Sequence, residues 1–346
     1  MGVDLGEIVV KRKTSLEALS GKVIAIDAFN VLYQFLASIR QEDGTPLMDY
    51  KGNITAHLSG LFYRSLKLLE NGIKPVYVFD GKPPELKEAV HLERASAKAE
   101  AHEKWKKALE EERLEEAKRY ASATSRLTSE MVEESKELLD AMGIPWIQAP
   151  GEGEAQSACM ARDGLAYAAA SQDFDSLLFG APILIRNISI TGRRKVPRQD
   201  RYVMIEPEEI SLEETLSTLG INREQLITIG ILIGTDYNRG IKGVGPKTAL
   251  KIVREYSDFN SAIAYVEKRY NYEFETAPRE ILDIFLNPPC VKIKERLTWK
   301  RIDIEAVVEL LVRAHDFSEE RVRKTAESVI KSLEEKGEQR SLGQWL

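Results

Sequence analysis

The pattern of apolar and polar positions near the start of the chain alternates between strand-like and helix-like segments. Residues 22–30 (KVIAIDAFN) and 74–81 (KPVYVFDG) are short runs of β-branched and aromatic residues that lead into an Asp, which is typical of buried strands. Residues 32–40 and 54–72 carry apolar side chains at helical spacing, and the second segment stops at Asn-Gly. The order of strand, helices and strand predicts a parallel sheet of the α/β class.

The alternation continues through the middle of the chain. Further helices and strands are predicted in turn at residues 131–143, 144–150, 152–164 and 165–171. Residues 186–205 have the pattern of two strands joined by a basic loop with Gly and Pro breaks. Helical segments then follow at 211–220, 222–234 and 246–256. We therefore expect an α/β fold with a mostly parallel central sheet flanked by helices.

One helical segment has almost no apolar face. Between residues 98 and 119, 14 of 22 residues are charged, and the large apolar positions are Trp105, Leu109 and Leu114. A helix of this kind buries little surface, so we expect it to project from the core as a long arm.

Composition narrows the class of protein. The chain has 346 residues, 43% of them hydrophobic, and a net charge of −6, which suits one large or two ordinary domains and argues against a simple polycation. Cys159 and Cys290 lie far apart in sequence and the four His are scattered, so we expect neither a disulfide framework nor a zinc cluster. A reducing compartment is therefore expected. The N-terminus has no signal-peptide pattern, and Gly6 stands where a myristoylation site needs Ser or Thr. The longest apolar run, residues 226–234, is too short to span a bilayer. These features predict a soluble intracellular protein.

Acidic residues follow the predicted strands at several points. In a parallel sheet, ligands bind beyond the carboxyl ends of the strands. Single acids close the first two strands, and two pairs of acids spaced i, i+2 follow the next two. With one acid at the end of an apolar helix, the candidates are Asp27, Asp80, Glu152, Glu154, Asp173, Asp175 and Asp236.

This acidic set has a plain and a functional interpretation. Each acid alone also suits a helix cap or a favourable charge at a helix N-terminus. The i, i+2 pairs are more informative, because like charges at one strand end repel unless a cation lies between them. Oxygen ligands without His or Cys suit Mg²⁺ or Mn²⁺, and this many carboxylates suit two ions roughly 4 Å apart, as in phosphodiester hydrolases.

A rival interpretation concerns residues 173–177. The sequence DFDSL partly matches the D-x-D-x-T/V loop of aspartate-nucleophile phosphatases, in which Asp173 would be phosphorylated. Leu177 departs from that pattern, and the loop lies in mid-chain, whereas the phosphatase loop usually opens its domain.

The segment 240–251 (GIKGVGPKTALK) has the composition of a phosphate-binding hairpin. Its glycines permit a tight turn with outward-facing amides, Pro246 suits the first position of the next helix, and the helix N-terminus favours an anion. Helix-hairpin-helix elements hold a nucleic-acid backbone in this way without reading bases. An ordinary glycine-rich connection is the alternative. The candidate DNA-binding residues here are Gly243, Gly245, Lys247, Thr248 and Lys251.

Three other side chains suit a nucleic-acid substrate. Lys87 and Arg94 lie seven residues apart on a predicted helix after Asp80, where they could neutralise charge on a scissile phosphate, although two solvated helix charges would look the same. Tyr33 lies six residues after Asp27 and could stack on a base, although Tyr more often packs in a core.

Five ordered segments resemble the signature motifs of the flap endonucleases, the structure-specific 5′-nucleases of replication and repair. They read AIDAFNVLYQFL, VFDGKPPELK, APGEGEAQSACM, SQDFDSLLFG and LIGTDYNRGIKGVGPKTALKIV. The likeness is to the archaeal type and covers essentially the full chain.

The resemblance implies an endonuclease that cleaves 5′ flaps at junctions of single-stranded and duplex DNA, with some 5′–3′ exonuclease activity. The seven acids would hold two Mg²⁺ ions, for which Mn²⁺ substitutes, and Lys87 and Arg94 would assist catalysis. It also implies stacking by Tyr33, a helical arch over the active site at about 82–126, and a helix-hairpin-helix element at about 226–256 that binds duplex DNA with a monovalent cation.

The resemblance also divides the chain. An N-terminal nuclease segment (1–126) and an internal one (127–335) precede a tail (336–346) that we expect to follow the last helix. The tail is similar to the box that binds sliding clamps, with Leu346 where a second aromatic is usual, and a frayed C-terminus is the alternative. Its candidate clamp-binding residues are Gln339, Leu342, Trp345 and Leu346.

These observations predict an intracellular, monomeric nuclease of the cytoplasm and nucleoid, whose partners are 5′-flap DNA and a sliding clamp. The alternative from another class is a structural protein that binds junctions and whose acids only cap helices. Such a protein would bind a flap and leave it intact in the presence of Mg²⁺.

Overall fold

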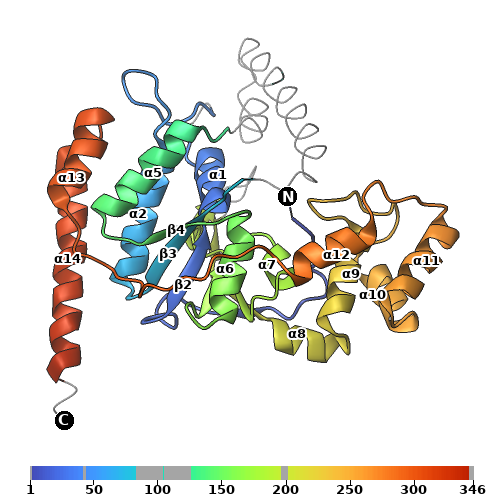
Figure 1. The fold of residues 1–346 in the computed structure, drawn as a ribbon. Helices are drawn as coiled ribbons and strands as arrows, with labels where there is room; N and C mark the ends of the chain where they lie inside the picture. Colours follow the sequence, from blue (N-terminus) through green and yellow to red (C-terminus); the bar gives the residue numbers. More distant parts are fainter. Residues whose placement is uncertain (1, 42–43, 83–103, 105–125, 196–201, 343–346) are drawn as a thin grey trace.

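The computed structural model describes most of the chain (Figure 1), namely residues 2–41, 44–82, 104, 126–195 and 202–342. The expected arch at about 82–126, with Lys87 and Arg94, lies almost wholly outside the described residues, as do the centre of the basic loop after residue 195 and the tail residues Trp345 and Leu346. No helix in the described part is long and apolar enough to cross a membrane.

A seven-stranded sheet forms the centre of the described structure, with strand order β1-β9-β6-β5-β2-β3-β4. The strands from β6 to β4 are parallel, and β9 and β1 add antiparallel pairs at the other edge. The mostly parallel sheet expected from the sequence is therefore confirmed. The strands are β1 Arg12–Lys13, β2 Val23–Asp27, β3 Lys74–Phe79, β4 Trp146–Gln148, β5 Ala168–Ala170, β6 Ile183–Arg186 and β9 Glu208–Ser211.

Helices cover both faces of the sheet because the central strands are apolar on both sides. On β5, Ala169 belongs to one hydrophobic cluster, whereas Ala168 and Ala170 belong to the other, as the two-residue repeat of a strand requires. The first cluster includes Ala158 of α6, and the second includes Phe62 of α2. Around the sheet lie α1 Ala28–Ser38, α2 Ala56–Glu70, α5 Ser129–Ala141, α6 Gly153–Arg162 and α7 Asp175–Leu178.

The second half of the chain is mostly helical, as its spacing predicts. A separate two-stranded hairpin, β7 Gly192–Lys195 with β8 Tyr202–Ile205, matches the strands expected around the basic loop. Figure 1 shows the helices after it on the α6 and α7 side of the sheet. They are α8 Leu212–Leu219, α9 Arg223–Ile233, α10 Pro246–Glu255, α11 Phe259–Tyr270 and α12 Pro278–Leu286.

The chain then returns across the molecule to the far side of the sheet. Residues 287–303 lead to α13 Ile304–Val308, the π-helix η3 Glu309–Ala314 and α14 Glu319–Leu342. Figure 1 shows α13 and α14 beside α2 and α5, and Val322 and Ala326 are buried in the cluster that includes α2. The expectation that residues from 336 onward follow the last helix was wrong, since α14 continues to Leu342. Glu, Lys, Gln and Arg dominate this stretch and are strong helix formers, which extends the helix past Gly337.

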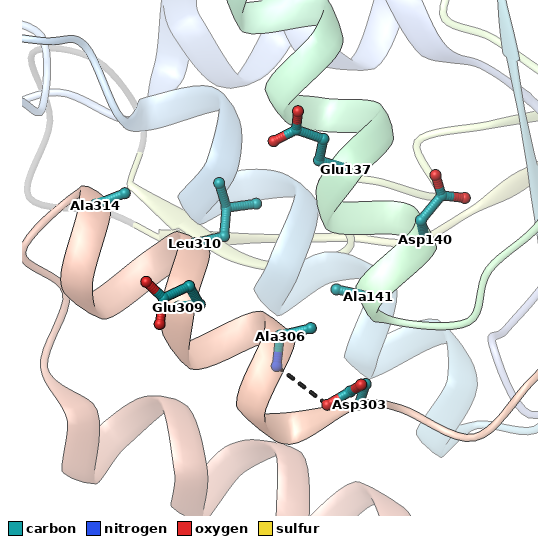
Figure 2. Close-up of a pocket in the computed structure, with 8 residues that line it drawn as sticks. All are labelled: Glu137, Asp140, Ala141, Asp303, Ala306, Glu309, Leu310 and Ala314. Atoms are coloured by element: carbon teal, nitrogen blue, oxygen red, sulfur yellow. Dashed lines mark hydrogen bonds between the residues drawn. The ribbon is translucent and has the colours of Figure 1, made fainter.

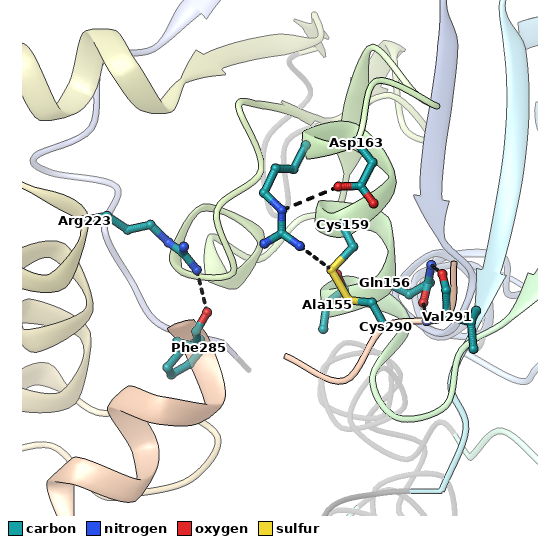
Figure 3. Close-up of a disulfide and its surroundings, with 9 residues drawn as sticks. Ala155, Gln156, Cys159, Asp163, Arg223, Phe285, Cys290 and Val291 are labelled. Carbon is teal, nitrogen blue, oxygen red and sulfur yellow. Dashed lines mark hydrogen bonds and ion pairs between the residues drawn. A yellow bond between two sulfur atoms is a disulfide. The ribbon is translucent and has the colours of Figure 1, made fainter. Parts of the chain in front are cut away.

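The returning segment is joined to α6 by a disulfide between Cys159 and Cys290, with a Cα–Cα distance of 6.6 Å (Figure 3). Beside it, Gln156 Nε2 donates to the Val291 carbonyl at 3.1 Å, and the Val291 amide donates to Gln156 Oε1 at 2.8 Å. The expectation of no disulfide framework, drawn from the distance between the two cysteines in sequence, was therefore wrong about this pair. A sequence separation of 131 residues concealed a spatial contact that arises only when residues 287–303 cross over α6.

Candidate functional site

The parallel register brings the acids at the strand ends to one edge of the sheet. β2 ends at Asp27, and β3 runs beside it in register, so Asp80, directly after β3, lies at the same edge. On the other side, Ala170 of β5 pairs with Ile26 of β2, which places Asp173 a few residues beyond the same edge. The sheet order thus makes neighbours of acids that are far apart in sequence.

Helix capping accounts for little of this acidic set. Asp27 is the N-cap of α1 and accepts a hydrogen bond from the Asn30 amide at 3.0 Å. Glu152 is at the N-cap position of α6, but its side chain makes no capping hydrogen bond. At α7 the N-cap is Phe174, so Asp173 is not the cap. The acids are therefore gathered for a reason other than capping.

The electrostatics of Asp27 show that several carboxylates share one space. Its side chain is buried, and burial raises its pKa well above the ordinary value. The charges of Asp80, Asp173 and Glu152 raise it further, against the opposing effect of the hydrogen bond from the Asn30 amide. Asp27 therefore shares this edge of the sheet with at least three other acids.

Glu154 shows the same effect at the other end of the cluster. Burial raises its pKa well above the ordinary value, and the charges of Asp175, Asp173 and Asp27 add to this. Its Oε1 accepts hydrogen bonds from the Ser176 amide at 3.1 Å and the Ser176 hydroxyl at 2.7 Å. The functional reading of the sequence is supported, because the charges of the neighbouring acids contribute to the raised pKa of both Asp27 and Glu154.

Asp236 joins the cluster through its neighbour Tyr237. The pKa of Tyr237 is far above its ordinary value, and burial is the largest cause. The charge of Glu152 and its hydrogen bond to Tyr237 raise the pKa further, as do the charges of Asp175 and Asp236. The Tyr237 hydroxyl donates to Glu152 Oε1. All seven predicted acids therefore meet in one region of the structure.

Backbone amides fix two of these carboxylates. The Gly153 amide donates to Asp80 Oδ1 at 2.7 Å, and the Val3 amide donates to Asp175 Oδ1 at 2.7 Å. The first contact ties the end of β3 to the start of α6, and the second brings the N-terminal segment into the site.

Asn30 links two strand ends from the first turn of α1. Its Nδ2 donates to Asp173 Oδ2 at 3.1 Å, and its Oδ1 accepts from the Gln172 amide at 3.2 Å. Its own amide donates to Asp27 Oδ1, so a single residue links the start of α1, directly after β2, to the loop after β5. A neutral amide does this without cancelling either negative charge.

The chemistry of the donor set fits a hard divalent cation, because it consists of carboxylate oxygens with no His or Cys among them. The raised pKa values of Asp27 and Glu154 indicate an excess of negative charge that such a cation would neutralise. Among the described residues, no three His, Cys, Asp or Glu side chains are arranged as a ready coordination group. Several oxygens instead face the protein donors named above.

Comparisons with known proteins agree with this arrangement. The XPG N-terminal domain matches residues 3–101 and the XPG I-region matches residues 143–236. Flap endonuclease 1 of Hyperthermus butylicus is 54% identical in sequence, and that of Pyrococcus furiosus is 52% identical. Each alignment covers 100% of this chain and 99% of the relative. The chain belongs to the flap endonuclease family. The solved structure of the Methanococcus jannaschii flap endonuclease, 41% identical, covers 97% of this chain and 100% of its own with a TM-score of 0.75.

Membership of the flap endonuclease family decides between the interpretations that the sequence left open. The chain is a nuclease of the XPG family, so the phosphatase and the non-enzymatic junction protein are both excluded. The resemblance to the archaeal flap endonucleases is confirmed by relatives that match the chain from end to end.

The predicted hairpin of this flap endonuclease connects α9 to α10. Gly240 packs directly against the end of α9, where a Cβ would lie 2.0 Å from the Ile233 carbonyl oxygen, so only glycine fits. Gly243, at the tip, has a φ of 87° and is exposed, while Ile241 and Val244 on either side are buried. The apolar pair anchors the loop and leaves its tip in solvent.

The predicted DNA-binding lysines after the hairpin face solvent, as a phosphate-binding surface requires. Gly245 is the N-cap of α10 and Pro246 its first residue, as predicted. Lys247 and Lys251 are exposed and Thr248 is half-buried. Lys247 Nζ lies 3.5 Å from a carboxylate oxygen of Glu7.

Tyr33 is not a core residue. It lies on α1, with 36% of its surface exposed. The alternative of a buried tyrosine is therefore wrong, since Tyr33 is exposed six residues after Asp27, the N-cap of α1.

A separate hollow of about 600 Å³, which none of the seven strand-end acids lines, lies between α5 and the α13–η3 segment (Figure 2). Glu137, Asp140 and Glu309 line it together with Asp303, whose side chain caps α13 by accepting from the Ala306 amide at 3.1 Å. This acidic lining repels phosphate, so the hollow is not part of the nucleic-acid surface.

Sequence reasoning missed the residues that orient the acids. Asn30 and Ser176 were not singled out, although each lies three residues or fewer from a predicted acid. Tyr237 directly follows Asp236, and that adjacency was the available signal. Nothing in the sequence connects Val3 with Asp175, because 172 positions separate them.

Proposed function

We propose that this nuclease is a metal-dependent, structure-specific endonuclease that cleaves 5′ flaps at junctions of single-stranded and duplex DNA, with some 5′–3′ exonuclease activity, in replication and repair. The carboxylate cluster at the carboxyl edge of the sheet carries the proposal, since Asp27 and Glu154 are buried beside other acids, and burial and then those neighbouring charges raise the pKa of both. The names of the relatives support the choice of flap substrate.

Two Mg²⁺ ions, with Mn²⁺ as a substitute, would supply Lewis-acid stabilisation of phosphoryl oxygens and lower the pKa of the attacking water. The residues that would hold them are the seven acids of the cluster. Asn30 and the amides of Gly153 and Val3 orient the carboxylates, and the apolar strands behind them limit access of bulk water.

Other residues are assigned to the substrate. Lys87 and Arg94 stabilise negative charge on the scissile phosphate. Tyr33 stacks on a base next to the cleavage position. The α9–α10 hairpin, with a bound monovalent cation, holds the duplex through its phosphates, because the N-terminus of α10 and the exposed Lys247 and Lys251 favour an anionic backbone.

We further propose that residues 1–126 and 127–335 form the nuclease, with the arch at about 82–126, and that the tail 336–346 binds a sliding clamp. The enzyme would act as a monomer on DNA in the cytoplasm and nucleoid. Gln339, Leu342, Trp345 and Leu346 would supply the clamp contacts.

Single-turnover cleavage of an end-labelled 5′-flap duplex tests the function, with Mg²⁺ and with chelator, beside a single strand of the same sequence. We expect metal-dependent cutting confined to the flap junction. Asp175→Asn should abolish cleavage and leave flap binding largely intact, because it removes charge from a buried acid of the cluster. Asp283→Asn on α12 is the matched control, since that acid is exposed and pairs with Arg279.

Equal turnover in Asp175→Asn and Asp283→Asn would refute the metal assignment. Equal cutting of the flap and of the single strand would leave a nuclease without the proposed structure specificity.

A further inference from the structure

Tyr237 is held rigidly at the edge of the carboxylate cluster. Its ring is 3% exposed and packs edge-on against Phe285 of α12, with ring centroids 5.5 Å apart at 83°. Its amide donates to Thr235 Oγ1 at 3.0 Å, and its carbonyl accepts from Thr276 Oγ1 at 3.2 Å. The ring therefore has little freedom to move.

The hydroxyl at the end of this ring donates to Glu152 Oε1. Glu152 occupies the N-cap position of α6 without using its side chain as a cap, so its own helix does not orient the carboxylate. The contact crosses 85 positions of sequence and joins the helical half of the molecule to the edge of the sheet.

The other acids near Glu152 are oriented differently. Asp80 and Asp175 each accept from a backbone amide, which side-chain substitution does not remove. Glu152 instead accepts a hydrogen bond from a side-chain hydroxyl, so one atom can be deleted to test its role.

We propose that Tyr237 is a positioning residue that fixes the Glu152 carboxylate in the orientation needed to bind a divalent cation. The proposal rests on the metal-dependent function proposed above and adds a residue that reaches the metal only through Glu152. Partners that orient a metal ligand typically contribute 10–100-fold in metal affinity, so deletion of the hydroxyl should weaken binding by about that factor.

Binding of Mn²⁺ to the full chain without DNA tests the proposal, with free Mn²⁺ measured by electron paramagnetic resonance. Tyr237→Phe keeps the ring packed on Phe285 and removes only the hydroxyl, and we expect its Mn²⁺ affinity to fall about 10–100-fold. Tyr272→Phe is the matched control, since its hydroxyl donates to the Arg239 carbonyl at 2.9 Å and not to a carboxylate. Circular dichroism of each variant verifies the fold.

A double-mutant cycle separates positioning from general destabilisation. In the Glu152→Ala background, Tyr237→Phe should cause no further loss of Mn²⁺ affinity, because the acceptor is already absent. For cleavage, the half-saturating Mg²⁺ concentration should rise in Tyr237→Phe by the same factor, while the rate at saturating Mg²⁺ stays within a few-fold of wild type.

Wild-type Mn²⁺ affinity in Tyr237→Phe would overturn the positioning role, as would a further loss in the Glu152→Ala background. If the wild-type chain itself neither binds Mn²⁺ nor cleaves the flap, the proposed function fails and this inference fails with it. Metal binding and cleavage that are lost in Asp175→Asn but intact in Tyr237→Phe would refute only the role of Tyr237.

Discussion

The cross-link between Cys159 and Cys290 gives the sharpest prediction about stability. The perturbation is Cys290→Ser, or reduction of the wild-type protein. The disulfide closes a loop of 131 residues, and the loss of loop-closure entropy in the unfolded chain for that length corresponds to about 5 kcal/mol at 25 °C. The hydrogen bonds between Gln156 and Val291 do not involve the sulfur atoms, so we expect residues 287–303 to stay in place after reduction and the effect to fall on the unfolded state.

Calorimetric unfolding measures the effect. With an unfolding entropy of about 2.1 cal/mol/K per residue over 346 residues, 5 kcal/mol corresponds to a fall in Tm of about 7 °C. Cys290→Ser and the double variant with Cys159→Ser should melt together, since each breaks the same link. Any extra loss in Cys159→Ser would report the bond from Arg162 Nη2 to Cys159 Sγ at 3.3 Å.

Reducing agent provides the internal control. It should lower the Tm of the wild type to that of Cys290→Ser and leave Cys290→Ser unchanged. Oxidised and reduced wild type that melt within 1 °C of each other would refute the reasoning, because a cross-link over this length cannot leave the unfolded chain unaffected.

Four further predictions follow from single contacts. Asn30→Ala should lower flap cleavage about 10–100-fold with flap binding retained, because the side-chain amide of Asn30 orients Asp173. Asn71→Ala at the C-terminal end of α2 should not lower cleavage, and equal cleavage rates in the two variants would contradict the role of Asn30. Lys247→Ala should weaken duplex binding and lower its salt slope by about 1, while Lys331→Ala on α14 should leave both unchanged in a salt titration. Gly240→Ala should lower the free energy of unfolding in urea by about 1–3 kcal/mol, because the added Cβ would meet the Ile233 carbonyl. Gly245→Ala should be tolerated, because the space around its added Cβ is open. Burial raises the pKa of Asp49, but hydrogen bonds from Asn53 and His315 outweigh this effect and lower the pKa to about 2. The ionised Asp49 carboxylate therefore stabilises the fold above its unfolded pKa of about 3.9, and this contribution is lost as the pH falls from about 4 to 2. Asp49→Asn should flatten the Tm profile over that range, and an unchanged acid limb would argue against it.

A helix cap and a member of the carboxylate cluster are not exclusive roles in this protein. Asp27 caps α1 through one oxygen and still lies among the other acids, whose charges raise its pKa. The cap fixes the side chain at the strand end, and the second oxygen stays available to the cluster.

Much of the fold follows from the sequence. The apolar runs that become β2 and β3 and the helical repeat of α2 are local patterns, so their positions were predictable. The acids at the strand ends were predictable too, because a parallel sheet places the ends of its strands at one edge.

The orientation of the site was not predictable in the same way. The strand order sets β5 beside β2, and only that neighbourhood brings Asp173 to Asn30 and Asp27. The contacts of Tyr237 with Glu152 and of Val3 with Asp175 join segments with no shared pattern.

The sequence by itself determined the class of the fold, the places of its acids and the family to which the chain belongs, because these depend on local periodicity and on motifs in a fixed order. The tertiary structure alone decided which acids are buried, which side chains orient them and that Cys159 meets Cys290. These depend on how distant segments pack, since a hydrogen bond or a disulfide requires a separation of a few ångströms that sequence spacing does not encode.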